Sequence, residues 1–276
     1  MPFTTLDNVI AGMRPPQPLI KTGITMAAVG AARAYTPWYA GGVPGASVAP
    51  TIGVNGEAVT PALNTPAGVT GGRIARSNPA GGLESRVARL SAQPSQPGKL
   101  WLIDRLWQNS GLSPTLTTAQ AITPAALPAR SEGGNANGQN VLAAIEHSAT
   151  GGAGTPTVTL TYTDQDNNAG ATSTLAGVTT PPIGTFELFA LANGDNGIRA
   201  PTNFIQSATR TSGAFHLVLF RLLAELDCPF ANAPAAADAL TGSFGRVYDD
   251  SVLQLVWFPS ATPALQLVGS YSETQN

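Results

Sequence analysis

The ten-residue run AFHLVLFRLL, at 214–223, constrains the fold of this chain more than any other stretch. Apolar residues fill both of its alternating faces, so a β-strand formed here is covered on both sides and cannot lie at the edge of a sheet. We therefore expect it to be the central strand of the fold. Its expected neighbours are the upstream segments 185–191 (TFELFAL) and 203–208 (NFIQSA).

The remainder of the chain also favours β structure. Glycine and proline contribute 30 and 23 of the 276 residues and are spread throughout, whereas long stretches with apolar residues at helical spacing are missing. About a dozen short segments with a period of two, separated by turn signals, predict an all-β fold of the β-sandwich or jelly-roll type. The clearest is 157–163, where Val158, Leu160 and Tyr162 alternate with threonines.

The chain is expected to divide into an N-terminal arm, residues 1–18, and a body, residues 19–276. The body could fold as two lobes, 19–135 and 136–276, because its length allows either one extended all-β domain or two.

The arm combines a short amphipathic helix with a proline-rich segment. A Thr or Asp cap precedes apolar residues that share one helical face, namely Leu6, Val9, Ile10 and Met13. Pro15 and Pro16 then forbid helix and impose an extended course. We expect this helical or extended arm to dock on its own body or on a neighbouring molecule.

A Gly/Pro-rich excursion runs from 41 to 97, with repeated turn and breaker signals. So long a stretch without a regular pattern is typical of a functional loop or of one that a partner orders, and we favour ordering by assembly. Within it, 84–92 (ESRVARLSA) predicts a strand or a single helical turn. Apolar residues spaced through the excursion could anchor it: Ile52, Val54, Val59, Val69, Ile74 and Leu83.

Charged residues make up only 11 % of the chain, against roughly 25 % in an average soluble protein. Few charges then need desolvation at each contact, which suits a protein packed against many others, although a low-charge secreted domain is the alternative. The net charge of −2, with 12 Arg and 2 Lys that form no cluster, argues against nucleic acid as a partner.

The single cysteine, Cys228, excludes an internal disulfide framework and is expected to be buried and inert. No apolar stretch reaches the roughly 18 residues of a membrane span, and the N-terminus lacks the pattern of a signal peptide. We therefore expect no membrane partner, and synthesis in a cytoplasm without export.

No constellation of residues predicts catalysis, a cofactor or a metal. The two histidines, His147 and His216, form no ligand pair at metal spacing with each other or with Cys228. The sequence also lacks the common nucleophile and phosphate-binding motifs. We expect a protein that is not an enzyme.

The loop that begins at Asp164 superficially matches a calcium-binding loop, with oxygen-bearing side chains at Asp164, Asp166 and Asn168. An EF-hand loop needs Gly at its sixth position and a carboxylate at its twelfth, and here these are Ala169 and Leu175. An Asx-rich turn is the expected structure.

Five stretches of strand and turn sequence resemble virion structural proteins of tailed bacteriophages. They are DRLWQNSGLSPTLTTAQAITPAALPAR at 104–130, NGQNVLAAIE at 137–146, TVTLTYTDQD at 157–166, GTFELFALANGDNGIRA at 184–200 and HLVLFRLLAEL at 216–226. The N-terminal LDNVIAGM is similar to the start of the same family, so the resemblance covers nearly the whole chain. This sequence departs from the family in the Asx-rich loop and in the long excursion.

The resemblance implies a non-enzymatic head protein, a decoration or cement protein that binds the outer shell and bridges neighbouring major capsid proteins. Its expected partners are the major capsid protein and further copies of itself, as a trimer. It would be made in the host cytoplasm and reside on the capsid surface. The expected contact residues are Leu6, Val9, Ile10, Met13, Pro15, Pro16, Trp38 and Tyr39, together with the excursion.

Two other functions remain open from the sequence. A tail or fibre-associated protein could bind a host-surface glycan through exposed aromatic residues, such as Trp38, Tyr39 and Trp107. A polysaccharide depolymerase is the third alternative.

Overall fold

The computed structural model describes residues 5–24, 26, 33–61, 72–76, 83–123, 125–239, 244–260 and 264–276. Strands account for 49 % of the chain, and the described residues contain one short α-helix, α1 (Leu6–Ala11), and one 3-10 turn, η1 (Pro37–Tyr39). The all-β prediction is confirmed.

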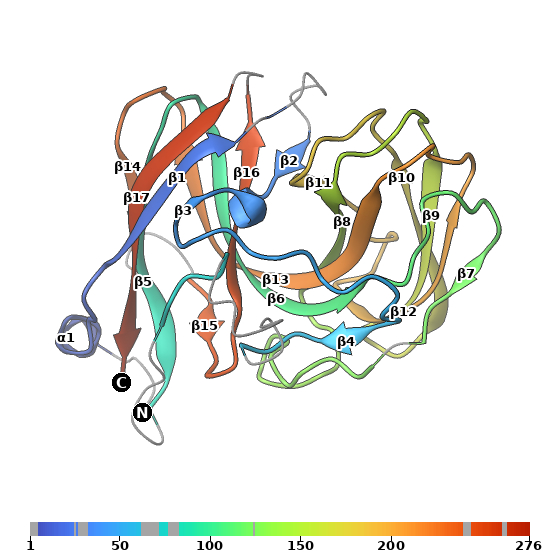
Figure 1. Cartoon of the computed structure of the whole chain (residues 1–276). Helices are drawn as coiled ribbons and strands as arrows, with labels where there is room; N and C mark the ends of the chain where they lie inside the picture. The colour runs from blue at the N-terminus through green and yellow to red at the C-terminus, as the bar shows by residue number, and fades with distance from the viewer. Residues whose placement is uncertain are drawn as a thin grey trace.

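Within the described residues, six antiparallel strands close into a barrel (Figure 1). Their order around the barrel is β13-β8-β11-β2-β16-β6, and β6 pairs again with β13. They are β2 (Ala34–Tyr35), β6 (Gly98–Asn109), β8 (Val141–Ala149), β11 (Thr185–Leu188), β13 (Ala214–Cys228) and β16 (Leu253–Pro259). The short β4 (Glu57–Ala58) pairs with β6 outside this ring.

A curled sheet covers one side of the barrel. Its order in the described residues is β14-β5-β17-β1-β3, and β15 also pairs with β5. The strands are β1 (Gln17–Ile24), β3 (Gly42–Val43), β5 (Ser85–Pro94), β14 (Ala235–Asp238), β15 (Arg246–Val247) and β17 (Leu265–Gln275). Its inner face contributes Leu19, Leu90 and Leu267 to one apolar core with Leu102 and Leu255 of the barrel.

A smaller sheet, in the order β10-β9-β12-β7, packs on another side of the barrel. The strands are β7 (Gln120–Ala121), β9 (Thr157–Asp164), β10 (Ala169–Ala176) and β12 (Ile198–Gln206). Val158, Leu160 and Tyr162 are buried and pack with Leu217 and Leu219 of the barrel, as the period-two pattern of β9 predicts. A hairpin joins β9 and β10.

The prediction that β13 is buried on both faces is confirmed. Leu217 and Leu219 pack outward against the small sheet, whereas Val218 and Phe220 point into the barrel. The predicted neighbours are wrong, because β13 pairs with β8 and β6 rather than with 185–191 and 203–208. At four residues, β11 is too short to cover a fifteen-residue strand, and it pairs with β8 and β2 instead.

The closed barrel also distinguishes the architecture from the predicted two-layer sandwich or jelly roll. Pairing of β13 with both β8 and β6 removes the free edges that a sandwich sheet would keep. The barrel takes strands from both 19–135 and 136–276.

The segment 84–92 forms a strand, β5, as one of its two predicted alternatives, and this strand lies between β17 and β14 in the curled sheet. The excursion also contains two short strands that were not predicted, β3 and β4. Of the expected anchors, Val59 and Ile74 are buried, while Ile52 is exposed. Val69 lies outside the described residues.

The arm forms the predicted short helix and docks on its own body. The side chain of Thr5 caps α1 by accepting a hydrogen bond from the Asn8 amide, 3.2 Å away. After the helix, the Arg14 amide donates to the Glu273 carbonyl at 2.8 Å, so the arm lies beside β17 (Figure 1). Strand β1 begins at Gln17, and the last two residues of the predicted arm therefore belong to the curled sheet.

Candidate functional site

The apolar face of the arm is presented to solvent. Leu6, Ile10 and Met13 are 48 %, 57 % and 48 % exposed, and Val9 is half-buried. Pro15 and Pro16, which link α1 to β1, are exposed as well. The helix ends at Ala11, so Met13 lies beyond it, bridged to Thr274, and not on the predicted helical face. Exposed apolar residues grouped on and beside one short helix are typical of a contact surface.

The position of the helix is fixed by contacts with β17. The Thr274 hydroxyl donates to the Val9 carbonyl at 2.7 Å. Gly12 lies so close to β17 that a Cβ there would collide with the backbone oxygen of Gln275. The close approach permits only glycine at this point, and the exposed residues of α1 are thereby held on the outside of the curled sheet.

A second apolar group lies on the outer face of the same sheet. Val43, Ile20 and Val268 occupy directly paired positions on β3, β1 and β17, and each is between 39 % and 50 % exposed. Residues paired directly across antiparallel strands share a face, so these three side chains form one row. Gly42 (φ +129°) permits the β1–β3 pairing, because a Cβ there would collide with the Ile20 carbonyl.

We call α1 and this three-strand row together the outer apolar face. Outward-facing positions around the row carry uncharged residues, namely Pro18, Ser91, Gln93, Gln266 and Ser270. The sequence predicts the helical part of the face. It gives no signal for the row, because residues 20, 43 and 268 become neighbours only through long-range pairing.

Of the two aromatic residues predicted as contacts, Trp38 is buried and Tyr39 is half-buried. Trp38 is buried against Val59 and Val252, and Trp107 is also buried. Tyr39 is half-buried, and its hydroxyl donates to the Glu146 carboxylate at 3.0 Å. The prediction that Trp38 and Trp107 are exposed was wrong, because both rings pack onto the barrel, whereas the contact role of Tyr39 stays a prediction.

Inside the barrel, Glu146 accepts hydrogen bonds from Arg105 Nη1 at 2.6 Å and from Gln254 Nε2 at 2.6 Å. The side chains of Arg105 and Glu146 are fully buried. The guanidinium of Arg105 also lies 5.6 Å from the Trp38 ring centroid. The hydrogen-bonded side chains of Arg105, Glu146 and Gln254 lie inside the barrel, beside the apolar cluster that contains Val218 and Phe220.

A second buried carboxylate, Glu187 of β11, contacts His147 of β8 and Arg210 of the turn after β12. Its Oε1 atom lies 2.8 Å from His147 Nε2 and 3.4 Å from Arg210 Nη2. Burial lowers the pKa of His147, although the neighbouring Glu187 acts in the opposite direction. The contact is therefore a hydrogen bond from a neutral imidazole to a carboxylate at pH 7.

His216 and Ser148 form a contact of the kind that a catalytic base makes with its nucleophile. His216 Nε2 lies 2.6 Å from Ser148 Oγ, but the other ring nitrogen, Nδ1, is buried without a hydrogen-bond partner in the described structure. Burial lowers the pKa of His216 to about 4. A catalytic base needs a group that orients it and a pKa near the working pH, and this histidine has neither.

Cys228 is buried, and desolvation raises the pKa of its thiol to about 11. Such a thiol is almost entirely protonated at neutral pH and is a poor nucleophile. The prediction that this cysteine is buried is confirmed.

The loop after β9 is the predicted Asx turn. Asp164 Oδ1 accepts from the amides of Asp166 and Asn168, at 2.9 and 2.8 Å, and the Asn168 side chain bonds Oδ2 at 2.8 Å. The hydrogen bonds from Asn168 hold the pKa of Asp164 below its ordinary value. Among the described residues, no group of three or more His, Cys, Asp or Glu side chains is arranged to hold a metal ion.

A search of the same described ranges finds no helix with the length and apolar character needed to cross a membrane. Comparison with protein-family models, with curated proteins and with solved structures found no match for this chain.

Proposed function

We propose that this chain is a non-enzymatic structural protein of a bacteriophage capsid, a decoration or cement protein. In this proposal it binds the outside of the shell, bridges neighbouring major capsid proteins, and acts as a homotrimer. The resemblance of the strand and turn sequences to phage virion proteins supports the proposal.

The observation that carries the proposal is the outer apolar face. Leu6 and Ile10 are exposed on a helix that is bonded to β17, Met13 is exposed just after the helix, and Ile20, Val43 and Val268 are exposed on the sheet that bears this helix. The positions around the sheet row are uncharged, although Asp7 on α1 and Arg14 after it are exposed charges, so covering the row loses little free energy to desolvation. The row suits permanent packing against another protein.

The proposed stabilisation of the shell depends on many copies that bind at symmetry-related positions. Each copy contributes a modest apolar contact, and copies related by symmetry are released together only if all contacts open at once. The closed barrel provides a stiff body that can transmit load between the shell subunits it touches.

The glycan-binding alternative loses two of the three aromatic residues that the sequence predicted for it. Trp38 and Trp107 are buried, so neither ring offers a face on which a sugar could stack, and only Tyr39 is half-exposed.

The proposal is tested by measuring how the protein binds to undecorated shells, which are capsids that lack it. The full chain and a chain that begins at Gln17, and so lacks α1 but keeps β1 whole, are each mixed with shells and sedimented. We expect the full chain to pellet with the shells and the shortened chain to stay in the supernatant. Analytical ultracentrifugation of the free protein tests the trimer.

A cooperative thermal transition of the shortened chain is the control for folding. Equal pelleting of both proteins would remove the arm from the mechanism. Failure of both to pellet would overturn the capsid proposal itself.

A further inference from the structure

The small sheet ends in a strand with an open edge, β10 (Ala169–Ala176). In the order β10-β9-β12-β7, this strand has one neighbour among the described residues, β9. Just beyond its end, the Gly177 amide donates to the Pro156 carbonyl at 2.8 Å, in register with the β9 pairing. Backbone groups alternate in direction along an antiparallel strand, so Thr172 and Thr174 point their amide and carbonyl groups away from β9.

The opposite side of β9 gives the same assignment. The Ser207 amide donates to the Thr157 carbonyl at 2.9 Å, so the backbone of Thr157 faces β12 and that of Val158 faces β10. Both Thr172 and Thr174 are exposed, and within the described part of the chain no further element forms a backbone hydrogen bond to either of them. Their four backbone groups are therefore open to another strand.

The open part of the edge has a limit at each end. At one end, a bulge at Gly170 (φ +87°) interrupts the pairing with β9. At the other end, the guanidinium group of Arg33 donates to the Ala176 carbonyl. The two exposed threonines lie between these limits, one on each side of Ser173.

Between these limits the strand carries none of the residues that usually protect a sheet edge. Exposed edges are commonly blocked by lysine, by other charged residues or by proline, because two open edges pair readily. Strand β10 contains neither a charged residue nor a proline, and the sequence holds no charge from Asn167 to Phe186. A second strand can therefore approach the two threonines without desolvating a charge there.

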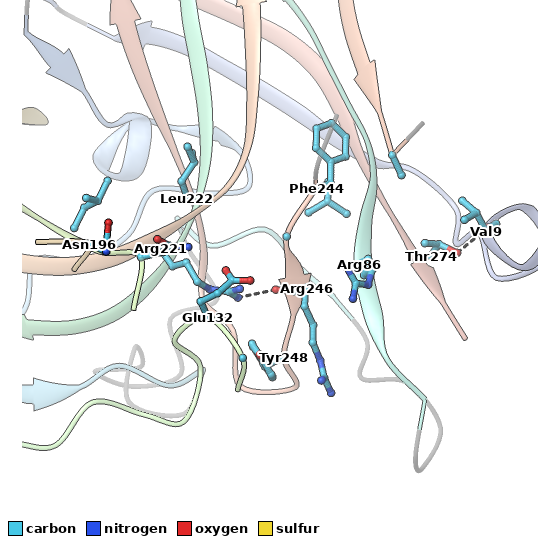
Figure 2. A pocket seen from close by; sticks show the side chains of 16 residues that line it. Val9, Arg86, Glu132, Asn196, Arg221, Leu222, Phe244, Arg246, Tyr248 and Thr274 are labelled. Atoms are coloured by element: carbon cyan, nitrogen blue, oxygen red, sulfur yellow. Dashed lines mark hydrogen bonds between the residues drawn. The ribbon is translucent and has the colours of Figure 1, made fainter. Parts of the chain in front are cut away.

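The charged cleft between the barrel and the curled sheet is a poorer place for a second chain (Figure 2). Its volume is about 1010 Å³, but its guanidinium groups are matched within the chain. Arg221 Nη2 donates to the Arg246 carbonyl at 2.6 Å, a dashed contact in Figure 2, and lies 3.6 Å from Asp104 Oδ2. Arg246 Nη1 lies 2.9 Å from Glu84 Oε1. The carboxylates of the chain itself thus satisfy the charges that a partner would otherwise recognise.

We propose that β10 pairs with β10 of a second copy, antiparallel about a two-fold axis at Ser173. Thr172 of each copy then lies opposite Thr174 of the other, and each such pair exchanges two backbone hydrogen bonds. Directly opposite threonines form a favourable cross-strand pair, and an uncharged strand brings no like charges together. Every copy carries the complement of this edge, as a two-fold contact requires.

The pairing gives the proposed trimers a means of contact with one another. Trimers occupy three-fold axes, so a two-fold contact through β10 links neighbouring trimers rather than the copies within one trimer. A few hydrogen bonds hold two free copies only briefly, but many such contacts reinforce one another on a shell. This use on a shell rests on the proposed function, whereas the pairing of two free copies does not.

Oxidation of cysteine variants traps brief pairing and reports its register. Thr172→Cys protein and Thr174→Cys protein are mixed and oxidised, and the covalent dimer is measured by non-reducing electrophoresis. In the proposed pairing the Cα atoms of these two positions lie about 5.5 Å apart, within reach of a disulfide, whereas like positions lie about 8 Å apart and beyond it. We expect the mixture to form the dimer about tenfold faster than either protein alone.

Ile205→Cys measures the rate of random collisions, because Ile205 is 37 % exposed on β12, two strands away from the open edge. The native Cys228 is buried, and a cooperative thermal transition of each variant is the control for folding. Dimer formation by the mixture at the rate of Ile205→Cys would overturn the inference, and so would faster formation by either protein alone. Shell binding is measured separately: mixture-specific dimers without shell binding defeat the proposed function alone, and shell binding without such dimers defeats this inference alone.

Discussion

Glu146 lies at the centre of the polar group inside the barrel, and its replacement gives the most informative stability prediction. Its Oε2 accepts from Arg105 at 2.6 Å and from Tyr39 at 3.0 Å, and its Oε1 accepts from Gln254 at 2.6 Å. Glu146→Leu removes all three bonds and leaves the charge of Arg105 buried without its carboxylate. Breaking a buried pair in this way costs about 3–5 kcal/mol, much of the 5–15 kcal/mol that stabilises a typical domain.

The companion change Arg105→Met should cost a similar amount, because it leaves the Glu146 carboxylate buried and unpaired. The double variant removes both charges, so no buried charge is left unpaired, and what remains is the loss of hydrogen bonds to Tyr39, Gln254 and Gln108. We therefore expect the double variant to be far more stable than the sum of the two single changes predicts.

Urea unfolding followed by circular dichroism at pH 7 measures this cycle. Glu146→Gln, which keeps the size of the side chain, supplies a value if the leucine variant does not fold. The exposed pair Lys99–Glu225, at 2.6 Å, is the matched control and should show coupling of no more than about 1 kcal/mol. Additive effects at Arg105 and Glu146, or a single change that costs less than about 1 kcal/mol, would refute the buried network.

Three further predictions concern the core and its titrating groups. Leu219 is fully buried between the barrel and the small sheet, so Leu219→Asp should abolish cooperative melting and Leu219→Ala should cost about 3 kcal/mol; normal melting of the Asp variant would show that β13 is misplaced. Burial lowers the pKa of His216 from 6.5 to about 4. Between these two pH values the unfolded chain binds a proton at His216 and the folded chain does not. Stability should fall by about 3 kcal/mol as the pH drops from about 6.5 to 4, and His216→Gln should flatten this slope in urea titrations; an unchanged slope would contradict the assignment. Cys228 should resist thiol reagents until the protein unfolds, and Cys228→Ser should leave shell binding intact, so rapid labelling of the native protein would contradict its burial.

Local patterns in the sequence predicted the elements that depend on nearby residues. The apolar faces of β13 and β9, the capped helix of the arm and the Asx turn at Asp164 all follow from spacing and side-chain chemistry. Each of these features is determined by residues that are close together in the sequence.

Features that depend on long-range pairing could not be predicted. Closure of the barrel joins Leu219 to Trp107, more than a hundred residues upstream. Arg105 and Glu146 form their buried ion pair only because closure places both inside the barrel. The row of Ile20, Val43 and Val268 likewise exists only after three distant segments pair.

Occupancy of undecorated shells by point variants, measured by cryo-EM, tests the central claim most directly. Leu6→Asp/Ile10→Asp places two carboxylates on the exposed side of α1, where they cost the free protein little but must be desolvated in a capsid contact. Leu116→Asp is the control, because Leu116 is 46 % exposed and lies in the loop that precedes β7. The account predicts full occupancy for the parent and for Leu116→Asp, and little for the α1 variant. Equal occupancy by all three proteins would contradict it.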